Sequence, residues 1–340
     1  MKPSGAFRLA AAGLAAFALG CGGEYPQSTL HPTADLGGSI DALYRTIFWW
    51  AVGVFVVVEA AVLYVIVRYR DRPGAGEPAH LHGSTVLEIA WTLAPVVVLV
   101  SIAVPTIRTI FRTDGDAPAD AMIVEVVGHQ WWWEYRYPEL GIVTANEFHV
   151  PLGRPVALEM ISADVIHSFW APKLGGKRDV IPGRTTRLFF TPDSVGVFRG
   201  QCAEFCGESH ANMGLRVVVQ DSADFAAWVA VQRTPPLTPE SLDATAQRGR
   251  ELYQQVRDPT THSCILCHRI EGVSGGTLGP DLTHLASRGT LAAGMFPNDS
   301  AGLSLWLEDP PAVKPGSLMP HVELTDDEIA AFVAYLRSLR

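Results

Sequence analysis

Two long apolar runs stand out when hydrophobic and polar positions are followed along the chain. They cover about residues 46–67 and 86–107. As a helix rising ~1.5 Å per residue, each run is ~30 Å long, which matches the hydrocarbon core of a membrane. Three arginines directly follow the first run: Arg68, Arg70 and Arg72. Positive residues favour the cytoplasmic side, so we expect a cytoplasmic loop between two spans of a membrane anchor over residues 21–112.

A shorter apolar stretch begins the chain. Lys2 and Arg8 accompany a run that is too short to cross a bilayer, which is typical of an export signal over residues 1–20. The next residues, Ala18-Leu19-Gly20-Cys21, resemble the lipobox of bacterial lipoproteins, although Ala18 stands where that pattern prefers leucine. The segment therefore predicts acylation of Cys21, cleavage of an ordinary signal nearby, or an uncleaved anchor.

Each predicted span carries one carboxylate. Glu59 lies near the middle of the first span and Glu88 near the cytoplasmic end of the second. A carboxylate at membrane depth is costly and usually faces a protein interior or a water path. We therefore expect Glu59 to hydrogen-bond in packing against another subunit, and both helices to have a protein partner.

The middle of the chain changes to short alternating runs. Apolar positions recur every second residue, and glycine, proline and aspartate separate the runs. Several short strands at such spacing predict an all-β sandwich or Greek-key barrel, here over residues 113–228. The clearest strands are expected at 122–127, 142–150, 156–161, 185–190 and 215–220.

A proline-containing segment, bounded at residues 229–243, predicts a linker. The pattern over residues 244–340 is then helical. The clearest 3.6-residue repeats lie at 246–255 and 326–339. Thr325, followed three residues later by Glu328, predicts the start of the last helix. The C-terminal part is thus expected to be an all-α domain.

Net charge and cysteine content limit the classes of function that the chain could have. A formal net charge of -9 leaves no basic field to neutralise phosphates, which argues against nucleic acid as a partner. Five cysteines, an odd number, would ordinarily indicate a free thiol. They fall, however, into Cys21, the pair Cys202 and Cys206, and the pair Cys264 and Cys267, and each group has a chemical role available other than a disulfide.

The first chemical motif has the order His…Cys-x-Glu-x-Cys-x3-His-x2-Met. It comprises His167, Cys202, Glu204, Cys206, His210 and Met213. Thiolate, imidazole and thioether are soft-to-borderline ligands, and methionine favours copper over zinc. Taken singly, the two cysteines could form a disulfide, Met213 could be core and His167 a turn residue. Taken together, the pattern indicates a metal site.

This motif resembles that of subunit II of the cytochrome c oxidases, in the haem–copper oxidase family. The resemblance implies a cupredoxin-like fold and a dinuclear copper A centre. The implied ligands are two bridging sulfurs, two imidazoles, a weak thioether and a backbone carbonyl, from Cys202, Cys206, His167, His210, Met213 and Glu204. The family also implies a Mg²⁺ or Mn²⁺ ion at the boundary with subunit I, held in part by the Glu204 side chain.

Other stretches resemble the same family. In residues 128–135 (GHQWWWEY), the position of Trp131 would receive electrons from cytochrome c; a structural aromatic belt is the other interpretation. In residues 87–95 (LEIAWTLAP), Glu88 would lie near the mouth of a proton-uptake path in subunit I, with simple capping of the span as the alternative. Residues 177–184 (KRDVIPGR) resemble a segment lying against subunit I.

The second chemical motif is Cys264-Ile265-Leu266-Cys267-His268, the C-x-x-C-H attachment signature of c-type haem. Two thiols at this spacing on a helical turn reach the two vinyl groups, and the adjacent imidazole of His268 ligates the iron. A redox pair or half a zinc site is the alternative for C-x-x-C alone. The adjacent histidine and the helical surroundings favour haem.

A haem that transfers electrons at high potential needs a soft sixth ligand. Residues 315–320 (PGSLMP) resemble the methionine loop of class I cytochromes c, which makes Met319 the expected ligand. Met295 is the rival and is expected in packing or beside the haem. In the same fold, the carbonyl of Pro280 would accept the N–H of the axial histidine. This resemblance covers residues 244–340.

Together these features predict the electron-input subunit of a respiratory oxidase in a bacterial inner membrane. Its copper and haem domains would lie on the periplasmic side. Electrons would pass from a cytochrome c or another periplasmic donor through haem c to copper A, and on to subunit I. There oxygen would be reduced to water with proton translocation. The expected partners are subunit I, other oxidase subunits, the donor and the lipid bilayer.

Two other functions stay open. One is the copper A subunit of a nitric oxide reductase, which Glu88 and the fused haem disfavour. The other is a copper carrier, which the covalent haem and the anchor disfavour. A quinol oxidase subunit is excluded, because such chains lack the copper ligands. In the favoured interpretation, the short linker would hold the haem near Trp131 at an effective concentration on the order of mM.

Overall fold

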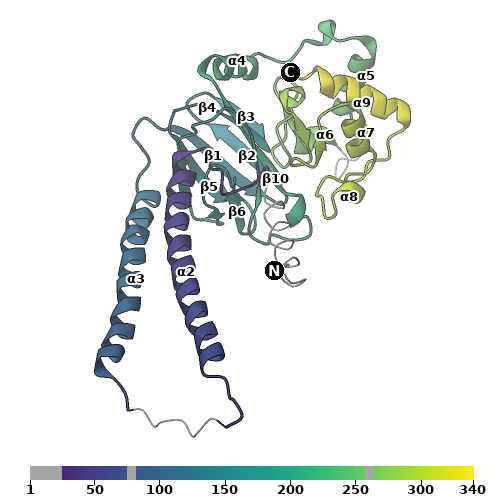
Figure 1. Cartoon of the computed structure of the whole chain (residues 1–340). Helices are drawn as coiled ribbons and strands as arrows, with labels where there is room; N and C mark the ends of the chain where they lie inside the picture. The colour runs from purple at the N-terminus through teal and green to yellow at the C-terminus, as the bar shows by residue number, and fades with distance from the viewer. Residues whose placement is uncertain (1–24, 75–81, 257–262) are drawn as a thin grey trace, which may run out of the picture.

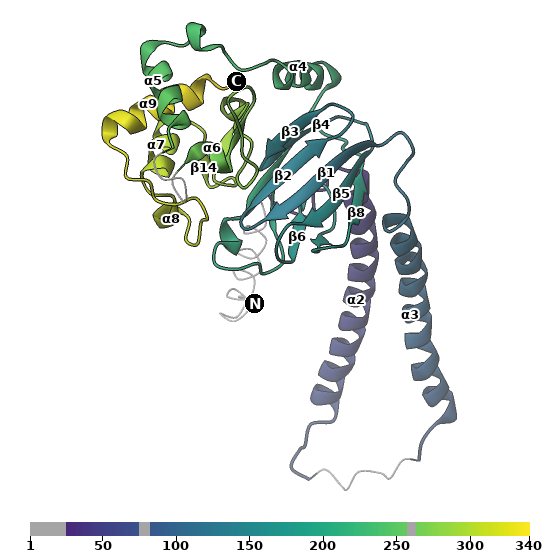
Figure 2. The ribbon, with the colours of Figure 1, turned by 180° about the vertical axis from the view of Figure 1, so that it is seen from behind.

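The computed structural model describes residues 25–74, 82–256 and 263–340, so the expected export signal and Cys21 lie outside the described residues. Figure 1 shows three parts in chain order: two long helices, a β-rich domain from which they project, and a helical domain. Figure 2, the view from behind, agrees that the helical domain lies alongside the β-rich domain and away from the two long helices.

The two long helices contain the predicted spans. Helix α2 covers Asp35–Arg68 and helix α3 covers Thr85–Thr113. Their most apolar windows have mean hydropathies of 2.4 and 2.2, and none of either window is buried within the chain. A helix that is apolar all round needs an apolar environment. Both helices are therefore long and apolar enough to cross a bilayer.

The first turn of α2 is fixed to the β-rich domain. The backbone N–H of Asp35 donates to the carbonyl of Thr191 (3.1 Å), and the Asp35 carboxylate accepts the N–H of Thr191 (2.7 Å). Leu36 is buried against Gly175, and a side chain added at position 175 would collide with Leu36. The anchor and the β-rich domain are thus joined by packed contacts.

The β-rich domain is a sandwich of two five-stranded sheets, as predicted. One sheet has the order β3-β2-β1-β5-β8 and the other β4-β10-β9-β6-β7. The strands are β1 Met122–His129, β2 Trp132–Tyr137, β3 Ile142–Ala145, β4 Glu147–Pro151, β5 Val156–Ser162, β6 His167–Trp170, β7 Arg178–Val180, β8 Thr186–Phe190, β9 Gly196–Cys202 and β10 Gly214–Gln220. Every second residue of β10 is buried, so each sheet contributes one apolar face to the core.

One predicted strand is in fact two. The run over residues 142–150 divides at Asn146, whose φ of 62° lies in the left-handed region that asparagine tolerates better than most residues. The break leaves β3 in the first sheet and sends β4 into the second. Asn146 and Trp133 exchange hydrogen bonds of 2.8 and 2.9 Å across the break. The single-strand prediction was wrong because alternation does not reveal a change of sheet.

Four strands were not predicted: β2, β6, β7 and β9. Two of these, β6 and β9, carry the first histidine and the first cysteine of the metal motif. Strand β9 was not predicted because it contains glycines at positions 196 and 200, and glycine is atypical of strands. The structure explains Gly200, since an added Cβ there would meet the carbonyl oxygen of Trp170 and the side chain of Leu215.

Helix α4 (Ser222–Gln232) closes one end of the sandwich. The Asp221 side chain caps it by accepting the N–H groups of Ala223 and Asp224. Trp228 is buried and stacks on His149 of β4 at 4.4 Å. Since α4 continues to Gln232, the connection to the next domain starts at residue 233 and not at 229. This connection includes the 3-10 turn η2 (Pro239–Ser241).

The C-terminal domain is built on two crossed helices. Helices α5 (Ala244–Gln254) and α9 (Asp326–Ser338) cross at Gly249, where a Cβ would collide with the backbone of Ala331. Thr325 and Glu328 form the predicted capping box at the start of α9. Between them lie α6 (Cys264–Cys267), α7 (Ser300–Glu308), α8 (Pro310–Val313), the turn η3 (Leu285–Ser287) and the short strand pairs β11 (Arg269–Ile270) with β12 (Ser274–Gly275) and β13 (Thr290–Leu291) with β14 (Phe296–Pro297).

Candidate metal and haem sites

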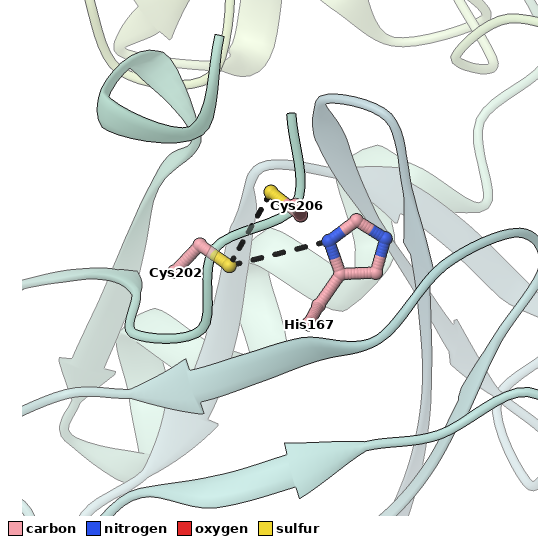
Figure 3. A group of neighbouring side chains, drawn as sticks. All are labelled: His167, Cys202 and Cys206. Carbon is pink, nitrogen blue, oxygen red and sulfur yellow. Dashed lines mark hydrogen bonds between the residues drawn. The ribbon is translucent and has the colours of Figure 1, made fainter. Parts of the chain in front are cut away.

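Three buried donor side chains from separate segments meet at one end of the sandwich. His167 begins β6, Cys202 ends β9, and Cys206 lies in the loop that follows. Strands β6 and β9 are neighbours, with Phe169 paired to Cys202. The three ligand atoms lie within 4.8 Å of one another. Figure 3 shows the imidazole and both sulfurs turned toward one another.

The two sulfurs are close without being bonded. Their separation is 3.8 Å, whereas a disulfide needs about 2.05 Å, and both cysteines are free thiols. The interpretation of this pair as an exported disulfide therefore finds no support in the geometry. Two sulfurs at this spacing leave room for metal between them.

The remaining donors of the motif lie on either side of the sulfur pair. The Cys206 sulfur is 3.5 Å from Nδ1 of His210 and 3.9 Å from the sulfur of buried Met213. His210 begins the 3-10 turn η1 (His210–Asn212), which returns the chain toward β10. The Glu204 carbonyl oxygen is 3.3 Å from the Cys202 sulfur, while its side chain is exposed. All six donors of the sequence motif are thus brought together.

His167 is held in one orientation. Its Nε2 lies 2.7 Å from a carboxylate oxygen of Asp164, which leaves Nδ1 facing the Cys202 sulfur at 4.0 Å. Burial opposes protonation, but the hydrogen bonds to Asp164 and Cys202 raise the pKa of His167 overall. An outer carboxylate that fixes the ring of a metal-binding histidine is a common arrangement. Asp164 was not predicted as a site residue, although its position three residues before His167 was a usable signal.

Electrostatics favour cations at this site. The contact with Cys206 lowers the pKa of Cys202, and the hydrogen bond from His167 acts in the same direction against burial. The Cys202 sulfur in turn raises the pKa of Cys206, because a second negative charge beside the first is unfavourable. Bound metal cations would remove this conflict and deprotonate both thiols. The donors and their charges therefore fit a copper pair.

The C-terminal domain encloses a cavity of about 350 Å³ around the C-x-x-C-H motif. Cys264, Cys267, His268 and Met319 all line it, and Met295 is not among the described lining residues. Most of the remaining wall is apolar, formed by Leu252, Leu282, Leu285, Leu303, Phe332 and Leu336. An apolar cavity with two thiols, an imidazole and a thioether on its wall fits a covalently attached haem.

His268 is oriented for iron. Its Nδ1–H donates to the carbonyl oxygen of Pro280 at 2.8 Å, as the sequence resemblance implied, and this leaves Nε2 free. Burial lowers the pKa of His268, which favours the neutral imidazole that binds metal. Gly279 lies against the ring, where a Cβ would approach Cε1 to 2.6 Å. The loop containing Gly279 and Pro280 thus supplies both the hydrogen-bond acceptor and the space for the His268 ring.

Trp131 lies between the two sites. Its indole N–H donates to the carbonyl of Cys206 at 3.0 Å, and Gln130 donates to the same oxygen at 2.7 Å. Trp131 is only 9% exposed, and Gly316 of the C-terminal domain lies against its ring. Gln130, Trp131 and Trp132 also line the cavity that holds the C-x-x-C-H motif. The structure thus brings the predicted electron-input residue into contact with both candidate sites.

Glu88 is remote from these sites. It lies in the first turn of α3, at the end of that helix away from the sandwich (Figure 1). Its carboxylate folds back toward Gly83, where a Cβ would approach it to 2.6 Å. A carboxylate in the first helical turn is favoured by the helix dipole, so capping alone accounts for its local geometry.

Family models match each part of the chain. The model described as cytochrome c oxidase subunit II, transmembrane domain, matches residues 32–109. The corresponding periplasmic domain matches residues 141–221, and the model described as cytochrome c matches residues 246–340.

Curated relatives match most of the chain's length. Cytochrome c oxidase subunit 2 of Alkalihalophilus pseudofirmus is 35% identical over 96% of this chain and 95% of that protein. Cytochrome c oxidase subunit 2 of Bacillus subtilis is 32% identical over 94% of each. Quinol oxidase subunit 2 of Bacillus spizizenii is 30% identical over 66% of this chain and 72% of that protein.

Proposed function

The chain belongs to the cytochrome c oxidase subunit II family, and we propose that it is the electron-input subunit of a respiratory oxidase. It combines two membrane-spanning helices, a cupredoxin-like domain and a helical cytochrome c domain, which confirms the predicted fold class. Membership of this family implies a membrane-bound oxidase complex, copper A in the cupredoxin-like domain and haem c in the C-terminal domain.

In this proposal, copper A is held by the six donors of the sulfur motif. Cys202 and Cys206 would hold a pair of coppers through their sulfurs, and His167 and His210 would each supply one imidazole. Met213 would add a weak thioether and Glu204 a backbone carbonyl. Two coppers that share one electron through bridging thiolates change geometry little on reduction, which favours fast electron transfer. The close approach of all six donors supports this assignment.

The haem is held by residues of the C-terminal cavity. Cys264 and Cys267 would form the thioethers, His268 would bind the iron, and Met319 would supply the other axial ligand. Met319 is preferred to Met295 because it lines the cavity. A methionine-ligated haem has a high reduction potential, which suits delivery of electrons to copper.

The observation that carries the proposal is the position of Trp131. Its indole nitrogen donates to the backbone of Cys206, while its ring borders the cavity of the cytochrome c domain. We propose that electrons from an external cytochrome c, or another periplasmic donor, reach the copper site by this route and continue to subunit I. Oxygen reduction to water and proton translocation belong to the complex, since the oxygen-reducing site lies in subunit I.

The anchor would contact the other oxidase subunits in the inner membrane. In this proposal, Glu59 forms a packing hydrogen bond and Glu88 lies near the entrance of a proton path of subunit I. The exposed Glu204 side chain would hold Mg²⁺ together with residues of subunit I. Both soluble domains would face the periplasm, as the arginines after the first span predict.

Spectroscopy and turnover on the purified complex test the proposal. We expect a seven-line copper hyperfine pattern in electron paramagnetic resonance, a methionine-ligated haem c spectrum, and oxygen consumption with reduced cytochrome c. Cys206→Ser should abolish the dinuclear signal and leave the haem c spectrum unchanged. Nitric oxide consumption without oxygen consumption would instead assign the chain to a reductase of nitric oxide. A mononuclear copper that a chelator removes readily would indicate a carrier.

A further inference from the structure

The cytochrome c domain packs directly against the sandwich and is not connected to it by the linker alone. Two of its segments press against the sandwich: the turn over residues 289–294 and the loop over residues 314–317. The second segment ends two residues before Met319. The arrangement therefore differs from a simple tether, in which the linker alone would raise the effective concentration.

The turn over residues 289–294 binds to β4 and β10. Buried Glu147 accepts the backbone N–H of Gly289 at 2.8 Å and the hydroxyl of Thr290. Ala293 contacts Gly214 closely: a Cβ added at Gly214 would lie 2.7 Å from the carbonyl oxygen of Ala293. Ala293 has a φ of 65°, in the left-handed region that non-glycine residues rarely adopt. The packing of the turn against the sandwich is therefore close and specific.

Lys314 joins the second segment to Trp131. Its side chain is 4% exposed, and its Nζ donates to the carbonyl of Trp131 at 2.6 Å and to that of Ala292 at 3.2 Å. One acceptor thus lies on each domain. Burial lowers the pKa of Lys314 to about 7. A buried amine is costly unless it is hydrogen-bonded, so these two bonds define its position.

The residues after Lys314 touch the aromatic ring itself. Gly316 has a φ of 76°, and an added Cβ would approach Cη2 of Trp131 to 2.7 Å. On the copper side, a Cβ at Gly207 would approach the same indole to 2.9 Å. Ser209 donates to the carbonyl of Pro315 at 2.6 Å. The indole is therefore enclosed by glycine backbone from both domains.

We propose that Lys314 is a positioning residue that locks the methionine loop of the cytochrome c domain onto Trp131. This inference rests on the proposed function, because it concerns the same haem-to-copper route. Lys314 holds the backbone of Trp131 while Gly316 contacts its ring, and Met319 follows in the same loop. The lock keeps the haem cavity beside the indole that is hydrogen-bonded to Cys206. Glu147 supports the same docked state from the other segment.

The test compares Lys314→Leu in the full oxidase complex with the wild type. Arg248→Leu is the matched control, since Arg248 is an exposed cation of the same domain. Glu147→Gln provides a second variant at the other contact. Two quantities are measured: amide hydrogen exchange of residues 289–294 and 130–133, and the rate of electron transfer from photoreduced haem c to copper A. Optical and paramagnetic resonance spectra report on the two sites.

In Lys314→Leu, amide protection at both segments should fall about 10- to 100-fold, the range expected for loss of a hydrogen-bonded buried cation. Electron transfer should slow and become dependent on solvent viscosity, because the domains must then find each other. Glu147→Gln should move both quantities in the same direction, and Arg248→Leu should move neither. The spectra of haem and copper should stay unchanged in all variants.

Unchanged protection and unchanged transfer in Lys314→Leu would overturn the inference. So would an altered haem or copper spectrum, because Lys314 would then act through a site and not through docking. If the wild-type complex showed no transfer from haem to copper, the proposed function would fail. The protection data would still decide whether Lys314 holds the two domains together.

Discussion

Gly128→Ala should damage the copper site without replacing any of its ligands. Gly128 is buried in β1 beneath His167, and an added Cβ would lie 2.9 Å from Cδ2 and 3.3 Å from Cγ of that ring. Carbon atoms pack favourably at about 3.5–4.0 Å, so the imidazole must move by about 0.5–1 Å. His167 has little freedom to move, because it is fully buried and its Nε2 is 2.7 Å from Asp164.

The steric clash between the added methyl group and His167 sets the size of the expected losses of stability and copper affinity. Inserting a methyl group into a packed core costs about 1–3 kcal/mol of stability. A displacement of about 0.5 Å also exceeds the ~0.2 Å tolerance of metal–ligand distances. Loss of support around a ligating histidine typically weakens metal binding about 10- to 100-fold. We therefore expect copper affinity to fall by about that factor.

The assay measures copper retained per haem c during titration with a chelator, together with the copper hyperfine pattern. The haem, attached covalently to the same chain, is an internal standard. Gly38→Ala is the control, because its added methyl group meets nothing within 4 Å in the described structure. An unchanged chelator midpoint and unchanged hyperfine splitting in Gly128→Ala would refute the claim that His167 is held tightly against Gly128.

Three further predictions concern ligation, packing and pH. Met319→Ala should lower the haem reduction potential by on the order of 0.1 V or more, because a soft thioether favours ferrous iron; redox titration checks this, and an unchanged potential would favour Met295 as the ligand. Gly249→Ala should destabilise the cytochrome c domain by about 3 kcal/mol, since its Cβ would collide with backbone across the α5–α9 crossing, whereas Gly275→Ala, which meets nothing within 4 Å, should leave its thermal unfolding unchanged. Burial lowers the pKa of His149 from its usual 6.5, so the folded sandwich binds fewer protons than the unfolded chain just below that pH. Its stability should be fully present above about pH 6.5 and decline as the pH falls below it, and His149→Gln should flatten this slope in melting curves recorded from pH 5 to 7.5; equal slopes would contradict the assignment.

Local patterns in the sequence were sufficient for the chain's parts and for its donor atoms. The spans of the anchor follow from length and hydropathy, and the capping box at Thr325 follows from two residues at a fixed spacing. The C-x-x-C-H motif needs a single helical turn, so its chemistry can be recognised without a fold. The copper donors could be identified because five of the six lie within one loop and its borders, from Cys202 to Met213.

Only the tertiary structure determined how these parts pack together. The strand break at Asn146 was not predictable, because alternation continues through it while the chain changes sheets. Gly128 packs against the His167 ring only because β1 and β6 face each other across the core.

The contact between the two domains was also beyond the sequence. The short linker predicted that the haem would be held near Trp131, but nothing in the linear pattern marked Lys314 or Glu147 as docking residues. Their roles arise from contacts between residues up to 183 positions apart, which no local periodicity encodes. The sequence thus determined which atoms could bind copper and haem, whereas the distance and packing between the two sites were set only when the domains docked around Trp131.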